Sequence, residues 1–264
     1  MDKPIVVEKE VGGLPLTIEW GYLAKQASGS CLVRYGDTVV FSAAICGDPR
    51  GDGSFFPLTV DYREPNSAVG KFPGGFFKRE GRPTLKETLT MRLTDRPLRP
   101  MFPDWYKNEV LIQSNVYSND REIDPDVFSI IGASTALMVS DAPFMGPIGA
   151  VRLGLVGDEF IPFPTHAERA EGDLDLVVAG TKEAITMVEC GASELPEEQM
   201  VEALEYAHEL IQEIVELQEE LLKAAGKDAK KSLDDPNATE FDADTKKLVD
   251  KVPGFEKKMK EALT

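Results

Sequence analysis

One stretch of the chain, from Gly74 to Pro83, combines two adjacent aromatic side chains with several cations on a glycine-containing segment. Aromatic rings stack on unpaired bases, and lysine and arginine bind phosphates. The combination is therefore typical of surfaces that hold single-stranded RNA whatever its sequence. The candidate binding residues are Phe76, Phe77, Lys78, Arg79 and Arg82. The alternative is that both phenylalanines are buried and anchor the segment.

A second group of cations follows at helical spacing. Arg92 and Arg96 are four residues apart and share one face of a predicted helix, and Arg99 lies just beyond its end. The three side chains can therefore converge on an anion. The alternative is a set of surface ion pairs with Glu87 and Asp95.

Charge is unevenly distributed along the chain. The 264 residues carry a net charge of −17, which argues against a nucleic-acid partner because lysine and arginine make the contacts to phosphates. Between Lys71 and Arg99, however, there are eight basic and three acidic residues, a local net charge of +5. Of the other 43 acidic residues, 18 follow Glu194. This distribution favours nucleic-acid binding by the segment 71–99.

The predicted elements place both groups of cations around one long loop. Glycines and prolines between Arg63 and Pro83 predict an irregular segment, and Thr84 with Glu87 three residues later predicts a capped helix. That helix is expected to stop before the Arg96-Pro97 and Arg99-Pro100 pairs. Alternating apolar residues predict the strands 14–19, 31–35, 38–41, 58–62 and 109–117, and Asp124-Pro125 is expected to open a second helix.

The second half of the chain repeats the order of strands followed by a helix. Strands are predicted over 148–156, 159–163, 174–179 and 184–189, and an amphipathic helix from Pro196 to about Ala225, ending at Gly226. The pattern predicts an α+β protein with two related βαβ-type halves, residues 1–145 and 146–226. Residues 227–264 are expected to form a linker and the start of an all-α segment.

Several classes of protein are disfavoured by the residues present. The three cysteines are odd in number and lie in apolar segments, and the two histidines have no partner at ligand spacing, so neither a disulfide framework nor a metal site is expected. The sequence has no apolar run of membrane-spanning length, and its first residues, Met1 to Pro4, do not have the basic-then-apolar pattern of a secretory signal. We therefore expect a cytoplasmic protein without a membrane partner.

The motifs together resemble the first ribonuclease-PH-like core of polynucleotide phosphorylases, over nearly the whole chain up to Gly226. The two most specific runs are FFKREGRP at 76–83 and RLTDRPLRP at 92–100. Further matches are FFPLTV at 55–60, IGAS at 131–134, GPIGA at 146–150 and DLDLVVAGT at 173–181. The resemblance implies a fold like domain 2 of ribosomal protein S5.

The resemblance also carries expectations about function. It implies a homotrimeric ring that degrades messenger RNA from the 3′ end, using inorganic phosphate and releasing nucleoside diphosphates in a reversible reaction. It also implies that the loop bearing Phe76 to Arg79 narrows the channel around single-stranded RNA. Mg²⁺ is expected for the full enzyme, and no cofactor is expected to bind this chain.

This sequence departs from the family's catalytic second core at two places. A Gly-Ser-Ser turn that suits phosphate is replaced by Asp124-Pro125-Asp126, and the lysine of an Asp-x-Lys pattern is replaced by Val177 after Asp175. Carboxylates repel phosphate, and proline has no N–H to donate. We therefore expect no catalytic residue in this chain. Asp124 is expected to cap a helix that Pro125 starts, and Asp173 and Asp175 to be structural carboxylates.

Two functions remain open at this point. In the first, the chain guides RNA to a catalytic second core that it does not contain, while Arg92, Arg96 and Arg99 form a vestigial anion site. In the second, the chain is a non-catalytic RNA-binding ring subunit similar to the ribonuclease-PH-like proteins of exosomes.

Overall fold

The computed structural model describes residues 3–49 and 55–226, so the predicted linker and helical start at 227–264 lie outside the described residues. The first sheet has the strand order β1-β2-β3-β4-β6-β5, and only β5 and β6 pair in parallel. Its strands are β1 (Ile5–Val11), β2 (Leu14–Trp20), β3 (Gly29–Tyr35), β4 (Thr38–Pro49), β5 (Leu58–Arg63) and β6 (Asn108–Ser118). The predicted strands 14–19, 31–35 and 38–41 are confirmed as the antiparallel strands β2, β3 and β4, whereas β1 was missed in the sequence.

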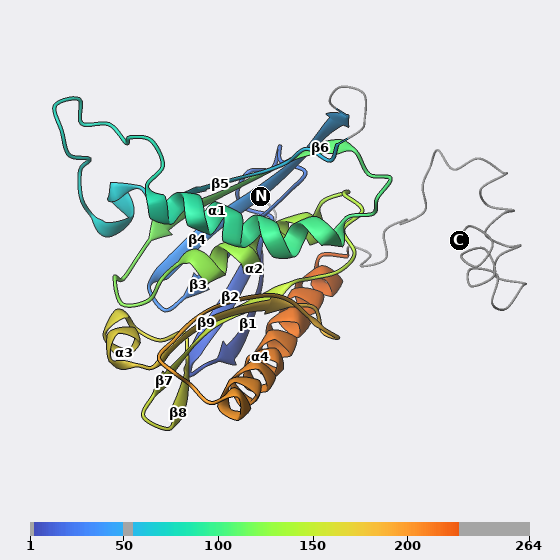
Figure 1. The fold of residues 1–264 in the computed structure, drawn as a ribbon. Coiled ribbons are helices and arrows are strands. Elements are labelled where there is room, and N and C mark those ends of the chain that lie inside the picture. The colour runs from blue at the N-terminus through green and yellow to red at the C-terminus, as the bar shows by residue number, and fades with distance from the viewer. Residues whose placement is uncertain (1–2, 50–54, 227–264) are drawn as a thin grey trace, which may run out of the picture. The chain divides into compact units, whose positions relative to one another are not determined.

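The second sheet is fully antiparallel and has the order β10-β9-β7-β8. Its strands are β7 (Gly149–Val156), β8 (Glu159–Pro162), β9 (Leu174–Gly180) and β10 (Ile185–Ala192). The helices are α1 (Leu85–Leu98), α2 (Asp126–Val139), α3 (His166–Glu171) and α4 (Glu197–Ala224), with the short 3-10 turns η1 (Asn66–Val69) and η2 (Arg99–Met101). Sheets and helices in this arrangement confirm the α+β class (Figure 1).

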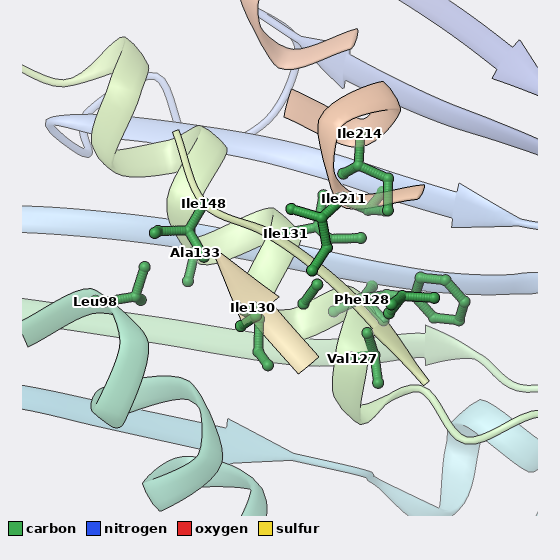
Figure 2. Close-up of a cluster of buried hydrophobic side chains, with 14 of the residues drawn as sticks. Leu98, Val127, Phe128, Ile130, Ile131, Ala133, Ile148, Ile211 and Ile214 are labelled. Atoms are coloured by element: carbon green, nitrogen blue, oxygen red, sulfur yellow. The ribbon is translucent and has the colours of Figure 1, made fainter. Parts of the chain in front are cut away.

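The core is built around α2, whose fourteen residues are all buried. It packs on β3 and β4 of the first sheet and on β7 of the second, so it needs apolar or small residues on every face. Figure 2 shows side chains of α2 beside Ile211 and Ile214 of α4. The two halves therefore share one hydrophobic core in the described part of the chain.

Helix α4 confirms the predicted amphipathic helix. Its buried side includes Ala207, Ile211, Ile214 and Leu221, which pack toward β7 and β1. Gly226 follows the C-cap with a φ of +64°, the left-handed conformation that glycine adopts without strain. No helix among residues 3–49 and 55–226 is long and apolar enough to cross a membrane.

Helix α1 does not stop before the Arg96-Pro97 pair as predicted, although it does end before the Arg99-Pro100 pair. Pro97 lies inside the last turn, and the helix continues to Leu98 before the chain enters η2. Proline has no N–H and so removes one helical hydrogen bond, but both Pro97 and Leu98 are buried. Packing of these two side chains therefore outweighs the local preference for an earlier stop.

The predicted start of α2 was also wrong. Pro125 occupies the N-cap position with a φ of −80° and a ψ of −3°, and no side chain caps the helix. Asp124 does not cap the helix because its carboxylate is bound by Lys86 from α1 and Arg169 from α3. Two cations from other elements thus replace the local backbone N–H groups as its partners.

Candidate nucleic-acid interface and the polar cavity

The segment 70–83, here called the aromatic-basic loop, leaves the body of the molecule between η1 and α1 and projects outward (Figure 1). Phe76 is 92% exposed and Phe77 is 80% exposed. Their rings pack edge to face with centroids 5.4 Å apart. The alternative that these rings anchor the loop by burial is therefore wrong, and both present open faces that bases can stack on.

The cations of the loop are exposed and uncompensated. Lys71, Lys78, Arg79 and Arg82 all lie on the surface, and none of them forms an ion pair with another residue that the structure describes. The acid of the loop, Glu80, accepts hydrogen bonds from Asn66. The positive charge of the loop is thus available to phosphates.

The aromatic-basic loop carries a third exposed aromatic residue, which was not predicted from the sequence. Phe72 is 89% exposed and follows Lys71, at the N-terminal limb of the same loop. The local pattern of a cation beside an aromatic residue could have identified it, since the same pattern marked Phe77 and Lys78. Its position makes it a further candidate for base stacking.

The root of the loop is closed by the predicted capping box, which is confirmed. Thr84 accepts a hydrogen bond from the Glu87 N–H at 3.1 Å, and Glu87 accepts one from the Thr84 N–H at 2.6 Å. The second oxygen of Glu87 accepts the N–H of Glu64 at 2.9 Å. One buried carboxylate therefore joins both limbs of the loop. The alternative hypothesis that Glu87 forms surface ion pairs with Arg92, Arg96 and Arg99 is wrong.

The three arginines of α1 and η2 do not share a partner. Arg99 pairs with Asp95 at 2.6 Å and also donates to two backbone carbonyls, while Arg96 pairs with Glu189 at 2.9 Å. Arg92 is exposed. The structure thus directs Arg96 and Arg99 to different carboxylates, and an anion site at these residues stays a prediction.

A polar cavity of about 640 Å³ lies where α1, α3, β9, β10 and the start of α2 meet. Its apolar side is formed by Leu85, Leu89 and Leu93 of α1 and by Val177. Charged side chains form most of the rest, among them Lys86, Asp124, Asp126, Arg152, Arg169 and Asp175. The sequence indicated Asp124, Asp126 and Asp175 but none of the cations that face them.

These six side chains neutralise one another. Arg152 pairs with Asp126 at 2.6 Å and with Asp175, and Arg169 pairs with Asp124 and Asp175. Lys86 binds Asp124 at 2.7 Å and Glu64 at 3.0 Å. The expectation of a structural carboxylate is met at Asp175. Asp173 is exposed, and its backbone carbonyl accepts the Ser193 N–H.

Burial and ion pairing compete in setting the pKa values of Asp124 and Lys86. Burial alone raises the pKa of Asp124, but the hydrogen bond from Lys86 and the charges of Lys86, Arg152 and Arg169 lower it below its ordinary value. For Lys86, burial opposes the charged form, yet Asp124 and Glu64 raise the pKa above its ordinary value. Both groups are therefore held in their charged forms at neutral pH.

These shifts predict a loss of stability in acid. Because the folded pKa of Asp124 is lowered, its ionised form stabilises the folded chain. This contribution to the free energy of unfolding is present above the unfolded pKa of about 3.9 and disappears as the pH falls through the folded pKa. The contribution of Lys86 is present below about 10.4 and is lost as the pH rises through its raised folded value. We expect Asp124→Asn to reduce the free energy of unfolding by about 1–3 kcal/mol at neutral pH.

Urea denaturation at a series of pH values checks this prediction. The difference between wild type and Asp124→Asn should shrink as the pH falls below about 3.9 and through the lowered folded pKa, since Asp124 is then progressively protonated in both folded and unfolded chains. Asp173→Asn, at an exposed carboxylate, is the matched control and should change little at any pH. A difference that stays constant with pH would show that the charge of Asp124 is not the source.

The cavity does not suit the Mg²⁺ that the resemblance implies for the full enzyme. Each of its three aspartates is paired with a guanidinium or ammonium group. Within the described ranges, no cluster of three or more histidine, cysteine or acidic side chains has the arrangement of a metal site. A divalent cation would have to displace these cations from their carboxylates.

Comparison with known families identifies the class of protein. Residues 13–143 match domain 1 of the 3′ exoribonuclease family, and residues 146–209 match domain 2 of the same family. The boundary between the matches falls between α2 and β7, where the first sheet gives way to the second. The chain therefore belongs to the 3′ exoribonuclease family, whose models describe ribonuclease-PH-like domains.

Within this family, the chain corresponds to the N-terminal ribonuclease-PH-like core of polyribonucleotide nucleotidyltransferases. It is 55% identical over 224 residues to that enzyme from Natranaerobius thermophilus, a match that covers 84% of this chain and 31% of the relative. The enzyme of Sulfurihydrogenibium azorense is 51% identical over 225 residues, with 85% and 32% covered. The chain thus spans about a third of the length of these relatives.

The fold is also found in a solved structure of low sequence identity. The crystal structure of rice (Oryza sativa) Rrp46 aligns with a TM-score of 0.64 at 15% identity and covers 80% of this chain and 96% of that one. At this identity the likeness concerns the fold alone. It confirms the ribonuclease-PH-like architecture predicted from the sequence.

Proposed function

We propose that this chain is the RNA-guiding first core of a phosphorolytic 3′→5′ exoribonuclease that acts in messenger RNA degradation in the cytoplasm. The full enzyme would be a homotrimeric ring that converts RNA and inorganic phosphate into nucleoside diphosphates, reversibly. The observation that carries the proposal is the exposed aromatic-basic loop. It has two exposed phenylalanine rings, and its cations form no ion pair with another described residue. This geometry supports capture of unpaired nucleotides by stacking and charge.

The division of labour follows from the polar cavity. Phosphorolysis needs a phosphate held beside the bond to be cleaved. At the positions that resemble the phosphate-binding turn, Asp124 and Asp126 are committed to cations, and Val177 is buried where the catalytic pattern has lysine. An incoming phosphate would meet carboxylates in place of hydroxyl and N–H donors. This core therefore binds and orients RNA, and the chemistry belongs to a second core.

The roles of individual side chains in the loop are distinct. Phe76 and Phe77 offer rings for successive bases, which is tolerant of sequence because every base has a flat face. Lys78, Arg79 and Arg82 attract the phosphates between those bases, which gives a salt-dependent affinity. A loop of this kind holds a strand while allowing it to advance, as exonucleolytic degradation requires.

The proposal is tested with the purified chain, by measuring single-stranded RNA binding over a salt series and phosphate-dependent release of nucleoside diphosphates in parallel. We expect binding whose logarithm falls with the logarithm of salt with a slope of roughly −2 to −3, for three or four phosphate contacts. Duplex RNA, whose bases are already stacked, should bind more weakly. No diphosphate release is expected.

A full-length relative such as the Natranaerobius thermophilus enzyme serves as the positive control for release. Absence of single-stranded RNA binding would overturn the guiding role. Phosphate-dependent release by this chain would overturn the assignment of catalysis to a second core and would direct attention to the arginines of α1.

A further inference from the structure

The aromatic-basic loop is closed at two levels by carboxylates. Glu87 joins the two limbs at the root, and Glu80 joins them again farther out. From this arrangement we infer that Glu80 is a positioning residue, which holds the loop so that its rings and cations face the RNA together. The inference rests on the proposed RNA-guiding function.

The outer closure has two hydrogen bonds on one side chain. One oxygen of Glu80 accepts the backbone N–H of Asn66 at 2.8 Å, and the other accepts the Asn66 Nδ2 at 2.9 Å. Glu80 and Asn66 are fourteen residues apart, and both are on the surface. Solvent competes for such bonds, so their role is to restrict the loop more than to stabilise the fold.

Asn66 is a fixed point because η1 is tied to the body. The backbone carbonyl of Ala68 accepts the N–H of Asn119 at 3.1 Å, and that of Val69 accepts the Arg121 guanidinium at 2.6 Å. The N–H of Lys71 returns to the Asn66 carbonyl at 2.9 Å. Glu80 therefore fastens the returning limb to an anchored turn, and the free part of the loop shortens to about residues 71–79.

The charge of Glu80 makes the inference testable. It is the only acid between Gly70 and Thr84, and it lies next to Arg79. If Glu80 acted only through its charge, removing it would strengthen RNA binding, because one fewer negative group would repel phosphate. If Glu80 positions the loop, removing it must weaken binding, because the loop is then mobile in the free protein and RNA has to order it on binding, at a cost in free energy. The two roles predict opposite signs.

Four variants separate charge from positioning. Glu80→Ala removes the charge and both hydrogen bonds. Glu80→Gln removes the charge, but a rotated Asn66 amide still allows two bonds. Asn66→Asp places two carboxylates together and breaks the closure. The double variant Asn66→Asp with Glu80→Gln has the wild-type net charge. The amide NH2 at position 80 donates to the carboxylate at position 66, and the amide oxygen at position 80 accepts the backbone N–H of residue 66, so both bonds are rebuilt.

We expect Glu80→Ala and Asn66→Asp each to bind a single-stranded RNA oligonucleotide about 3- to 10-fold more weakly than wild type. Glu80→Gln should bind at least as tightly as wild type, and the double variant should return to within about twofold. Equal affinities of Glu80→Ala and Glu80→Gln, or no recovery in the double variant, would overturn the positioning role.

A second measurement reads the loop without RNA. Trypsin cleavage after Lys71, nine residues from the substitution, should be at least about threefold faster in Glu80→Ala and unchanged in the double variant, because mobile exposed loops are cut fastest. Unchanged cleavage in Glu80→Ala would show that the closure does not restrain the loop. Thermal unfolding should stay the same in all four variants, since Glu80 is exposed, Asn66 is only partly buried, and neither belongs to the core.

The two failures can be told apart. If wild type binds single-stranded RNA no better than a variant lacking Phe76 and Phe77, the RNA-guiding function fails, and with it the positioning of RNA by Glu80. Trypsin then still decides whether Glu80 restrains the loop. If wild type binds RNA through those rings and Glu80→Ala binds equally well, only the role of Glu80 is overturned.

Discussion

Replacing Phe76 and Phe77 together by alanine is expected to weaken single-stranded RNA binding by about 2 kcal/mol or more, roughly 30-fold or more. Both rings are almost fully exposed and pack only on each other edge to face, so their removal leaves no cavity in the core. The slope of affinity against salt should stay nearly constant, because no cation is lost. Fluorescence anisotropy with a labelled oligonucleotide over a salt series measures both quantities.

Two further variants make the result specific. Tyr22→Ala removes another exposed aromatic side chain, 60% exposed on the β2–β3 connection, and should leave affinity unchanged. Lys78→Ala with Arg79→Ala should reduce the steepness of the salt slope by about 1.4, the value for two phosphate contacts on a single strand. Full affinity after loss of both phenylalanines would mean that RNA is held elsewhere on the chain.

Asp126→Ala is expected to have the largest effect on stability, reducing the free energy of unfolding by about 3–5 kcal/mol. Asp126 and Arg152 are both more than nine-tenths buried, and their side chains pair at 2.6 Å. Asp126 also accepts the N–H of Val127 at 2.8 Å. Its removal leaves a buried guanidinium short of one partner, which is costly because that group has lost its water.

Chemical denaturation of matched variants checks this expectation. Glu189→Ala removes a carboxylate from an exposed ion pair with Arg96 and should cost less than about 1 kcal/mol. Asp126→Ala combined with Arg152→Met should be more stable than Asp126→Ala alone, since the unpaired charge is gone. A cost for Asp126→Ala as small as that of Glu189→Ala would show that water reaches Arg152 and replaces the carboxylate.

Much of the fold was predictable because its signals are local. The capping box at Thr84 and Glu87 needs only four residues, and the amphipathic pattern of α4 repeats within one helix. Alternation of apolar residues located every described strand of the two sheets except β1. The aromatic-basic loop was equally visible, since glycine, proline, aromatic and basic residues stand next to one another in the chain.

Composition and spacing along the chain were sufficient for the two-part α+β fold and the loop proposed to bind RNA, and the sequence motifs carried the family resemblance. Only the tertiary structure showed that Phe76 and Phe77 are exposed, that Pro97 lies inside α1, and that Asp124 is bound by Lys86 and Arg169. The physical reason is that burial and ion pairing depend on which distant segments meet. Arg169 and Asp124 are 45 residues apart. No local pattern reports that α3 meets the segment before α2, where the His166 N–H donates to the Glu122 carbonyl, and so brings the two charges together.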